Sequence, residues 1–299
     1  MDWIRGMQRA IDYVEEHLTE PIDYERLSAY AYSSSYHFQR VFSILCGFTV
    51  GEYIRNRRLS LAGAELAKGN TKVIDVAMKY GYESPDSFAK AFYKFHGVLP
   101  SEAKNNGSRL KSFSRLVLKF SLEGGTVMNY RIEEKDEMVL TGYKRRFAGA
   151  PSERYEQQHD FMVNGETRFV RYALQGMSGD CSLEYSAVFN IDDDGYEYLI
   201  GSVIPNYFSS HLEKTIGKIN AEKLQVLSIS KQTYLVVESE RSAKCMQEHL
   251  DLRKQVVCDL LTDHKYHMVD KPEITVYHYD SNNTNDSYIE LWLPIENNK

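Results

Sequence analysis

The sequence predicts a two-domain fold: an all-α domain with two helix-turn-helix units, then an α+β domain of two strand-helix-strand-strand modules forming an antiparallel sheet. Three observations predict this class. The 299 residues are enough for two separate cores. Apolar residues in the first third recur at helical spacing and repeat at an offset of 50 residues. Later, short apolar strands alternate with single helices. We expect a first domain at 1–108, a linker at 109–127 and a second domain at 128–299.

The two halves of the chain differ in charge. Residues 1–125 hold 17 Lys and Arg against 14 Asp and Glu, a net charge of +3, whereas residues 126–299 hold 19 against 28, a net charge of −9. An acidic surface repels phosphate, so any nucleic-acid interface must lie in the first half. No apolar run reaches the roughly 18 residues that a membrane span needs, and we expect no membrane partner.

The cysteine pattern argues against metal and disulfide chemistry. Cys46, Cys181, Cys245 and Cys258 are widely spaced and include no C-x-x-C pair. Scattered thiols of this kind predict neither a zinc site nor a disulfide framework, and they are typical of a reducing compartment. We therefore expect a cytoplasmic protein with no metal and no cofactor.

A repeated unit defines the first domain. Ser34 or one of its neighbours is the expected N-cap of the first helix and Ser84 that of the second, in which Pro85 stands at the first helical position. A glycine closes each helix. A short helix is expected before each of them, and two short helices joined by a tight turn make a helix-turn-helix. The corresponding residues are Tyr32, Ser34, Phe38, Phe42, Leu45 and Gly47 in the first unit, and Tyr82, Ser84, Phe88, Phe92, Phe95 and Gly97 in the second.

Between the two units, a capping box predicts a long connecting helix. Thr49 and Glu52 have the spacing of the box, and the helix should run to about Lys68. At 1.5 Å per residue this is a rod of roughly 28 Å. Such a rod would hold the two units about one DNA turn apart, about 34 Å, so both could enter successive major grooves.

Several stretches of the first domain form a recognisable set at characteristic spacing: Tyr36–Phe42, Gly51–Leu59, Val76–Ala77, Gly81–Tyr82, Phe88, Phe92, Phe95–Gly97 and Pro100–Glu102. Through these stretches, residues 3–104 resemble the DNA-binding domain of the AraC/XylS family of transcription activators. The resemblance implies that the third and sixth helices of this domain read DNA and that RNA polymerase is a partner.

Carried over by position, these two helices supply the expected DNA contacts. Arg40 can bind guanine and Gln39 can bind adenine in the major groove. Of the residues that the second helix is expected to expose to DNA, only Lys90 is long and cationic, which favours phosphate contacts and shape readout there. Asp86 could accept from cytosine or cap its helix, and both cations could instead be ordinary surface residues. The full expected set is Ser35, Tyr36, Gln39 and Arg40, then Pro85, Asp86, Ser87, Ala89 and Lys90.

The second domain shows a looser internal repeat. In each half, the sequence pattern predicts a strand, a helix and two further strands. The pair Asp194-Gly195 is typical of a hairpin turn. Two such halves should pair into one antiparallel sheet with helices covering one side. The expected ranges are strand 138–143, helix 152–174 and strands 185–191 and 196–203, then strand 233–238, helix 243–261 and strands 273–279 and 287–294.

The last strand carries the candidate ligand site. With period two, Ile289, Leu291, Leu293 and Ile295 point to one face, and Tyr288, Glu290 and Trp292 to the other. A carboxylate flanked by two aromatic rings suits an organic cation, which gains from both the charge and the ring faces. The alternative is a solvated glutamate on an open sheet face, with the rings packing across strands.

Residues 128–296 resemble the gyrase-inhibitor-like (GyrI-like) effector-binding domains, most specifically in Tyr288–Ile295. The resemblance implies that Glu290 binds cationic, lipophilic ligands. Tyr198, Phe147 and Phe161 are weaker candidates for the pocket wall, and for these three the sequence favours core packing instead.

Taken together, these features predict a sequence-specific, non-enzymatic DNA-binding regulator. Its partners would be double-stranded DNA, a small cationic or amphipathic effector and RNA polymerase. Two alternatives stay open: the second domain could hydrolyse its ligand, with Glu290 acting through water, or it could serve as a protein-interaction module.

Overall fold

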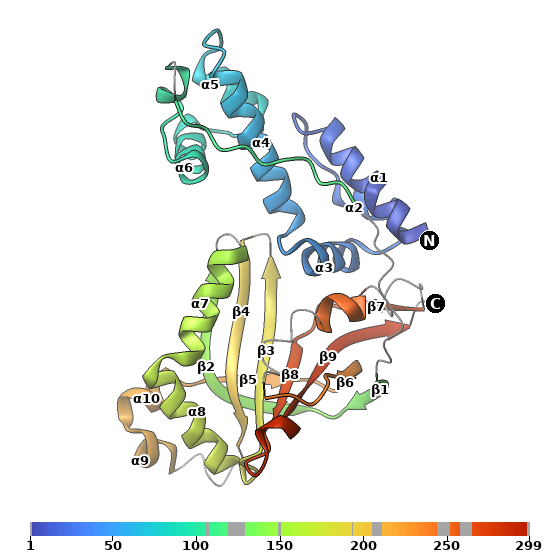
Figure 1. Cartoon of the computed structure of the whole chain (residues 1–299), viewed down its shortest axis with the longest axis vertical. Coiled ribbons are helices and arrows are strands. Elements are labelled where there is room, and N and C mark those ends of the chain that lie inside the picture. The colour runs from blue at the N-terminus through green and yellow to red at the C-terminus, as the bar shows by residue number, and fades with distance from the viewer. Residues whose placement is uncertain are drawn as a thin grey trace. The chain divides into compact units, whose positions relative to one another are not determined.

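Two units make up the described part of the chain. The first comprises most of residues 1–123 and the second residues 124–299 (Figure 1). The computed structural model describes residues 2–105, 108–118, 129–148, 151–192, 194–204, 211–243, 252–257 and 265–297.

The first unit is all-α and contains the repeated element that the sequence predicts. Ser34 accepts a hydrogen bond from the His37 amide (3.3 Å), and Ser84 accepts one from the Ser87 amide (3.2 Å), so both predicted N-caps are confirmed. The helices are α1 (Asp2–Glu16), α2 (Tyr24–Ala29), α3 (Ser35–Cys46), α4 (Val50–Leu66), α5 (Val73–Lys79), α6 (Pro85–His96) and the 3-10 helix η1 (Glu102–Lys104).

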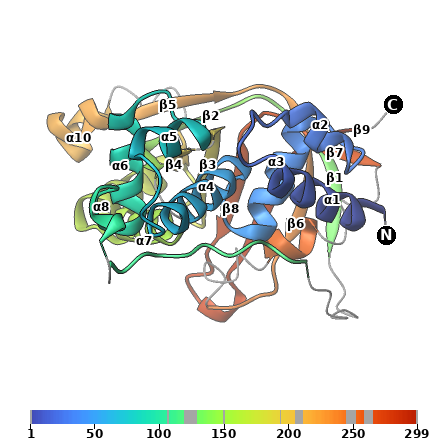
Figure 2. The same ribbon diagram turned by 90° about the horizontal axis from the view of Figure 1, so that it is seen from above.

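The connecting helix α4 begins with the predicted capping box. The Thr49 hydroxyl accepts from the Glu52 amide (3.1 Å), and the Glu52 carboxylate accepts from the Thr49 amide (2.8 Å). The second half of α4 packs with α5 and α6 (Figure 2). Because the apolar faces of three helices meet there, this unit has a continuous core: Leu59, Ala62, Leu66, Val76, Ala77, Tyr80, Phe88, Phe92 and Ala103.

Residues 108–118, which the sequence assigns mainly to a linker, form an extended strap along the first unit. The Lys111 amide donates to His96 Nδ1 (3.1 Å), and the Phe113 amide donates to Ser60 Oγ (3.0 Å). The Phe113 ring packs edge-on against Phe48 at 5.6 Å between centroids. Since side chains of α4 and α6 satisfy its backbone, this segment is held as part of the first unit.

The second unit is built on a single antiparallel sheet in which neighbouring strands are mostly not consecutive along the chain. Its strands follow the order β1-β6-β9-β8-β3-β4-β2-β5, with β7 beside β9 (Figure 1). The strands are β1 (Tyr130–Lys135), β2 (Met138–Ala148), β3 (Leu183–Asp192), β4 (Gly195–Val203), β5 (Gln225–Ile229), β6 (Gln232–Glu238), β7 (Tyr266–Met268), β8 (Glu273–His278) and β9 (Tyr288–Asn297).

The predicted internal repeat is present in this sheet. The strands β2, β3 and β4 of one half correspond to β6, β8 and β9 of the other, and β3 pairs with β8 at the centre. Each half also ties its helix to the sheet by an arginine–glutamate pair: Arg171 to Glu184 at 2.6 Å, and Arg253 to Glu273. Sequence reasoning missed both pairs, and it also missed the edge strands β1 and β5.

The helices of the second unit differ in part from prediction. The single helix expected over 152–174 is two helices, because Asn164 ends the first and caps the second by accepting from the Glu166 amide at 2.9 Å. Of the helix expected over 243–261, residues 252–257 are helical, residue 243 is in a turn, and the rest lie outside the described residues. The helices are α7 (Pro151–Val163), α8 (Gly165–Ser178), α9 (Leu212–Ile216), α10 (Lys218–Lys223) and the 3-10 helix η3 (Thr284–Asp286).

The two faces of the sheet have different coverings. Helices α7 and α8 pack on the face that carries Tyr143 and Phe147, which we call the helix-covered face (Figures 1 and 2). Glu290 and Trp292 point to the opposite face, which we call the Glu290 face. An apolar cluster on this second face includes Leu140, Ala187, Leu199, Tyr234, Val236, Ile274, Val276 and Trp292.

Candidate functional site

The candidate effector site centres on a buried carboxylate. Glu290 lies on β9, between β6 and β8, and its side chain is only 9% exposed. Oε1 accepts from the Arg131 guanidinium at 2.8 Å, and Oε2 accepts from Trp292 Nε1 at 2.7 Å. The prediction that Glu290 and Trp292 share a face is confirmed. The alternative of a solvated glutamate on an open sheet is wrong, because the inner strand and its neighbours cover the side chain.

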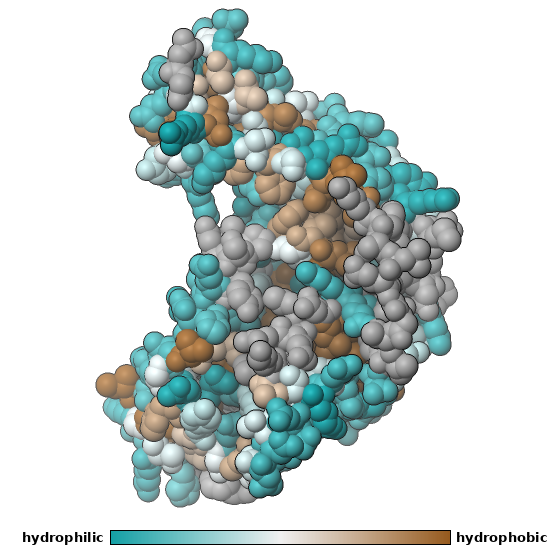
Figure 3. Space-filling model, in the orientation of Figure 1, coloured by the Kyte–Doolittle hydropathy of each residue, from teal (hydrophilic) through white to brown (hydrophobic). Residues whose placement is uncertain are grey.

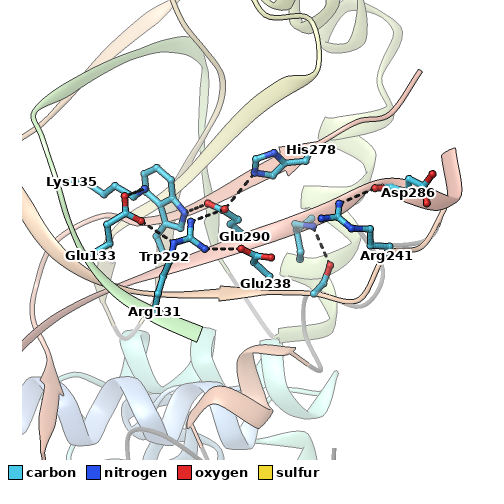
Figure 4. Close-up of polar contacts among 11 residues, drawn as sticks. Arg131, Glu133, Lys135, Glu238, Arg241, His278, Asp286, Glu290 and Trp292 are labelled. Atoms are coloured by element: carbon cyan, nitrogen blue, oxygen red, sulfur yellow. Dashed lines mark hydrogen bonds and ion pairs between the residues drawn. The ribbon is translucent and has the colours of Figure 1, made fainter. Parts of the chain in front are cut away.

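Arg131 is the residue of this site that the sequence did not reveal. Its guanidinium, carried by β1, bonds Glu290, Glu238 at 2.7 Å and Glu133 at 2.9 Å (Figure 4). The signal was present in Arg131-x-Glu133-x-Lys135, an alternating charged strip of the kind that edge strands carry. Its target could not be read from sequence, since Glu290 lies 159 residues further on.

A second cation lies on the aromatic part of the site. Lys135 Nζ is 4.3 Å from the centroid of the Trp292 ring, within the range of a cation–π interaction, and it also pairs with Glu133 at 2.8 Å. Tyr234 and Tyr185 pack against the same indole, with ring centroids 5.9 and 6.4 Å away. The site therefore combines a buried carboxylate with aromatic rings. Arg131 contacts the carboxylate, and Lys135 contacts the indole.

On the β8 side, three flat groups lie one against the next. The ring of His278 stacks on that of Tyr288 at 4.1 Å, and the Arg241 guanidinium lies 3.9 Å from the centre of the same tyrosine ring. His278 Nε2 is 3.8 Å from Glu290 Oε1, too far for a hydrogen bond. Tyr288 is thus placed beside Glu290, as predicted, but its ring already contacts two side chains.

Burial and neighbouring charges shift the pKa values of Arg131 and His278 at this site. Burial lowers the pKa of Arg131, but the hydrogen bonds to Glu290 and Glu133 outweigh burial and raise it above the ordinary arginine value. Burial lowers the pKa of His278 below 6.5, and the attraction of Glu290 offsets this only in part. At neutral pH we therefore count His278 as neutral and Arg131 as charged.

The three weaker candidates for the pocket wall are not at this site. Phe147, Phe161 and Tyr198 form an aromatic cluster on the helix-covered face, with ring centroids 5.8 to 6.5 Å apart. The strand register places Tyr198 on the face opposite Glu290. They are therefore not part of the wall around Glu290: Phe147 and Tyr198 project from strands toward the other face, and Phe161 belongs to α7. Phe147 and Tyr198 pack against Phe161, which agrees with the core-packing role that the sequence favoured for all three.

A surface hollow of about 230 Å³ lies elsewhere on the second unit. It is found near the end of β9 and lacks the residues around Glu290, so the chemistry described above does not belong to it. Its lining residues are Ile132, Thr233, Tyr266, Ile295, Glu296 and Asn297.

In the first unit, α6 presents the predicted surface. Pro85, Asp86, Ser87 and Lys90 are exposed and Ala89 is half-buried, while Phe88 and Phe92 face the core. Ser84, not Asp86, supplies the N-cap, so the carboxylate of Asp86 is not needed for capping. The predicted residues of this helix thus share one accessible surface.

The helix α3 differs from this expectation at Arg40. Its side chain is buried, with the residue only 6% exposed, although an exposed cation was predicted. The prediction took the face opposite Phe38 as open, but His37, Arg40 and Val41 form a second buried stripe at helical spacing. Ser35, Tyr36 and Gln39 are half-buried, and Gln39 donates to Ser35 at 3.1 Å.

Two arginines of α4, Arg57 and Arg58, bind other parts of the first unit. Arg57 pairs with Glu15 at 2.7 Å and donates to the Phe113 carbonyl at 2.5 Å. Arg58 donates to the carbonyls of Leu18 and Glu20 at 2.7 and 2.6 Å. Neither is therefore available as a freely mobile surface cation.

Comparison with known proteins agrees with both units. The family of integron-associated effector binding proteins matches residues 131–295, and a helix-turn-helix domain family matches residues 27–106. The transcriptional activator AarP of Providencia stuartii is 39% identical over 30% of this chain and 66% of its own length. The regulatory protein SoxS of Salmonella typhimurium is 32% identical over 33% of this chain and 92% of its own length.

Among solved structures, SAV2435 bound to tetraphenylphosphonium resembles 56% of this chain and 94% of its own, with 16% identity and a TM-score of 0.44. This chain spans less than two thirds of the length of several curated relatives that it matches, AarP included. None of the described helices is both long and apolar enough to cross a membrane.

The fold and the comparisons define a class: an AraC-type helix-turn-helix unit of regulatory proteins joined to a GyrI-like effector-binding unit. The chain belongs to the family of integron-associated effector binding proteins. Its first unit belongs with the AraC-type regulators, of which SoxS is one relative. Nothing in these comparisons supports the alternative of a hydrolase.

Proposed function

We propose that this protein regulates transcription by binding DNA through its first unit and an organic monocation through the Glu290 site. The observation that carries the effector part is the pairing of a buried carboxylate with the indole of Trp292, each already in contact with a cation of the protein. Such a carboxylate favours a charged partner, and the ring favours one with an aromatic or apolar body.

The DNA part rests on the accessible surface of α6. Lys90 is exposed, which supports a phosphate contact, and the short side chains before it would leave room for close approach to the groove. Arg40 can contact a base only if its buried guanidinium becomes exposed on DNA. We further propose a cytoplasmic location and contact with RNA polymerase, because a regulator of this kind acts on promoter DNA.

The DNA-binding proposal can be tested with sites selected from random duplexes. Lys90→Ala should weaken binding to every sequence and lower the slope of log affinity against log salt by about 1. Arg40→Ala should remove discrimination between the selected site and random DNA. Arg5→Ala, on the exposed surface of α1, is the control and should change neither quantity. Unchanged binding by Lys90→Ala and unchanged discrimination by Arg40→Ala would refute both roles.

The effector proposal can be tested by calorimetric titration of the full chain with tetraphenylphosphonium, an aromatic monocation, and with neutral triphenylphosphine oxide. Binding should be saturable for the cation alone and should weaken at least about tenfold in Glu290→Gln, since 1.4 kcal/mol corresponds to tenfold. Glu197→Gln is the matched control, because Glu197 lies on the same sheet face, three strands away. Equal binding of the neutral compound would argue against a cation site.

The alternative of a protein-interaction module finds little support on the visible surface. Over α8 to α10, apolar side chains are scattered among hydrophilic ones (Figure 3). Among the exposed large apolar residues of this region, Phe169 and Tyr172 lie three residues apart on α8 and Ile219 lies on α10. A pair of exposed rings on one helix is not by itself a docking surface, because monomers normally expose some apolar side chains.

A further inference from the structure

The Glu290 site is occupied by the protein's own cations. A ligand cation would need two positions, one against the Glu290 carboxylate and one over the Trp292 ring. The Arg131 guanidinium fills the first at 2.8 Å and the Lys135 ammonium fills the second at 4.3 Å (Figure 4). Any external cation must therefore compete with groups that are already in place.

The two sides of the Arg131–Glu290 contact differ in their freedom to move. Glu290 is on an inner strand and its side chain is 9% exposed, whereas the Arg131 side chain is 40% exposed. In the described part of the sheet, β1 is an edge strand that pairs with β6. The arginine can therefore turn toward water on its flexible stem, while the carboxylate stays in place.

Arg131 would also keep partners after leaving Glu290. Glu133 and Glu238 already bond the same guanidinium, and their side chains are 40% and 33% exposed. Lys135 keeps Glu133 in the same way. Displacement thus breaks one ion pair of Arg131 and the cation–π contact of Lys135 without leaving either cation unpaired, which lowers the free energy needed to open the site.

The charges of the cluster indicate the valence of the ligand. Glu133, Glu238 and Glu290 supply three negative charges against the two positive charges of Arg131 and Lys135, which leaves a net charge of −1. One positive charge at Glu290 balances the cluster. A monocation therefore fits better than a dication.

Resting on the proposed function, we propose that Arg131 and Lys135 are built-in competitors of the effector. A monovalent aromatic cation binds by displacing the Arg131 guanidinium from Glu290 and the Lys135 ammonium from the Trp292 ring. The two residues thereby set the affinity threshold of the sensor and exclude ligands that lack either the charge or the flat apolar group. Neutral aromatic compounds cannot replace the ion pair that they would break.

The test is a calorimetric titration of the full chain with tetraphenylphosphonium at pH 8. Arg131→Met keeps the apolar stem but removes the charge and the donors. If Arg131 occupies Glu290 in at least nine molecules of ten, its removal should tighten binding about tenfold or more. Arg146→Met is the matched control: Arg146 is also 40% exposed and pairs with Asp192 instead. This control should change the dissociation constant less than about twofold, since it alters only distant charge.

The outcomes separate the two proposals. If the wild type binds the cation and Arg131→Met binds it equally well or more weakly, the competitor role is overturned and the effector site stands. Absence of binding in both proteins overturns both proposals. Tightening of the same size in Arg131→Met and Arg146→Met would indicate a general charge effect and also overturns the competitor role.

A second variant guards against loss of folding. If circular dichroism shows that Arg131→Met is unfolded, Lys135→Gln takes its place and should tighten cation binding several-fold, because it clears the Trp292 ring. Phenylguanidine supplies an independent readout. It should raise the melting temperature of folded Arg131→Ala more than that of the wild type, because the vacated carboxylate then accepts a free guanidinium. An equal rise in both proteins contradicts the competitor role.

Discussion

The strap along the first unit makes a specific stability prediction at Arg57. This side chain joins α4 to α1 through Glu15 and to the strap through the Phe113 carbonyl, and both charged side chains are nearly buried, at 12% and 10% exposure. Arg57→Met keeps most of the volume but removes three hydrogen bonds. Glu15 would retain the Tyr53 hydroxyl at 2.6 Å as its remaining bond among those described here.

The magnitude follows from this geometry. Breaking a fully buried ion pair by removing one partner costs about 3–5 kcal/mol. Because about a tenth of each side chain is open to water, we expect about 2–4 kcal/mol for Arg57→Met after this discount. Arg115→Met is the matched control, since Arg115 also pairs with α1, at Asp12, but the two side chains are 49% and 40% exposed. It should cost less than about 1 kcal/mol.

Urea unfolding in a Trp292→Phe background measures both variants, because Trp3, on α1, is then the sole tryptophan. Adding Glu15→Gln to Arg57→Met should recover part of the loss by removing the unpaired charge. The hydrogen bonds from Arg57 and Tyr53 outweigh burial and hold the pKa of Glu15 below 4.5. The stabilisation is therefore complete above the unfolded value and is lost as the pH falls through the folded one. Equal losses from Arg57→Met and Arg115→Met would refute the reasoning.

Two further predictions concern stability. Burial lowers the pKa of His96 below 6.5, so the unfolded chain binds more protons just below that pH, and the first unit should lose stability as the pH falls from 7 to 5. Urea midpoints followed by Trp3 fluorescence in the Trp292→Phe background should depend less on pH in His96→Gln than with His96 present. An unchanged dependence would exclude this residue as the cause. An added Cβ at Gly201 would lie 2.0 Å from the Thr141 carbonyl oxygen, so Gly201→Ala should destabilise the second unit by about 2 kcal/mol or more. In contrast, a Cβ at Gly176, on the exposed side of α8, would have no atom within 4 Å, so Gly176→Ala should stabilise this unit by about 0.5–1 kcal/mol. Trp292 fluorescence in a Trp3→Phe background can measure both changes.

Sequence alone was reliable wherever the deciding interactions are local. The caps at Ser84 and Thr49 satisfy amides within three residues, so spacing and residue type suffice to predict them. The period-two pattern of β9 likewise assigned Glu290 and Trp292 to one face before any partner strand was known. The repeat at an offset of 50 residues predicted two helix-turn-helix units, because each unit is marked by local signals: caps, helical spacing and a closing glycine.

The tertiary structure decided which distant groups meet. Strand order brings Arg131 near Glu290, and the register of the paired strands puts Tyr198 on the opposite face from Glu290. Arg40 is buried although its spacing from Phe38 predicts exposure. Nothing within a few residues determines such outcomes, because the free energy of a buried charge depends on partners that only chain topology supplies. The sequence thus determined the two units and the carboxylate of the site, and the fold determined that the protein's own cations occupy it.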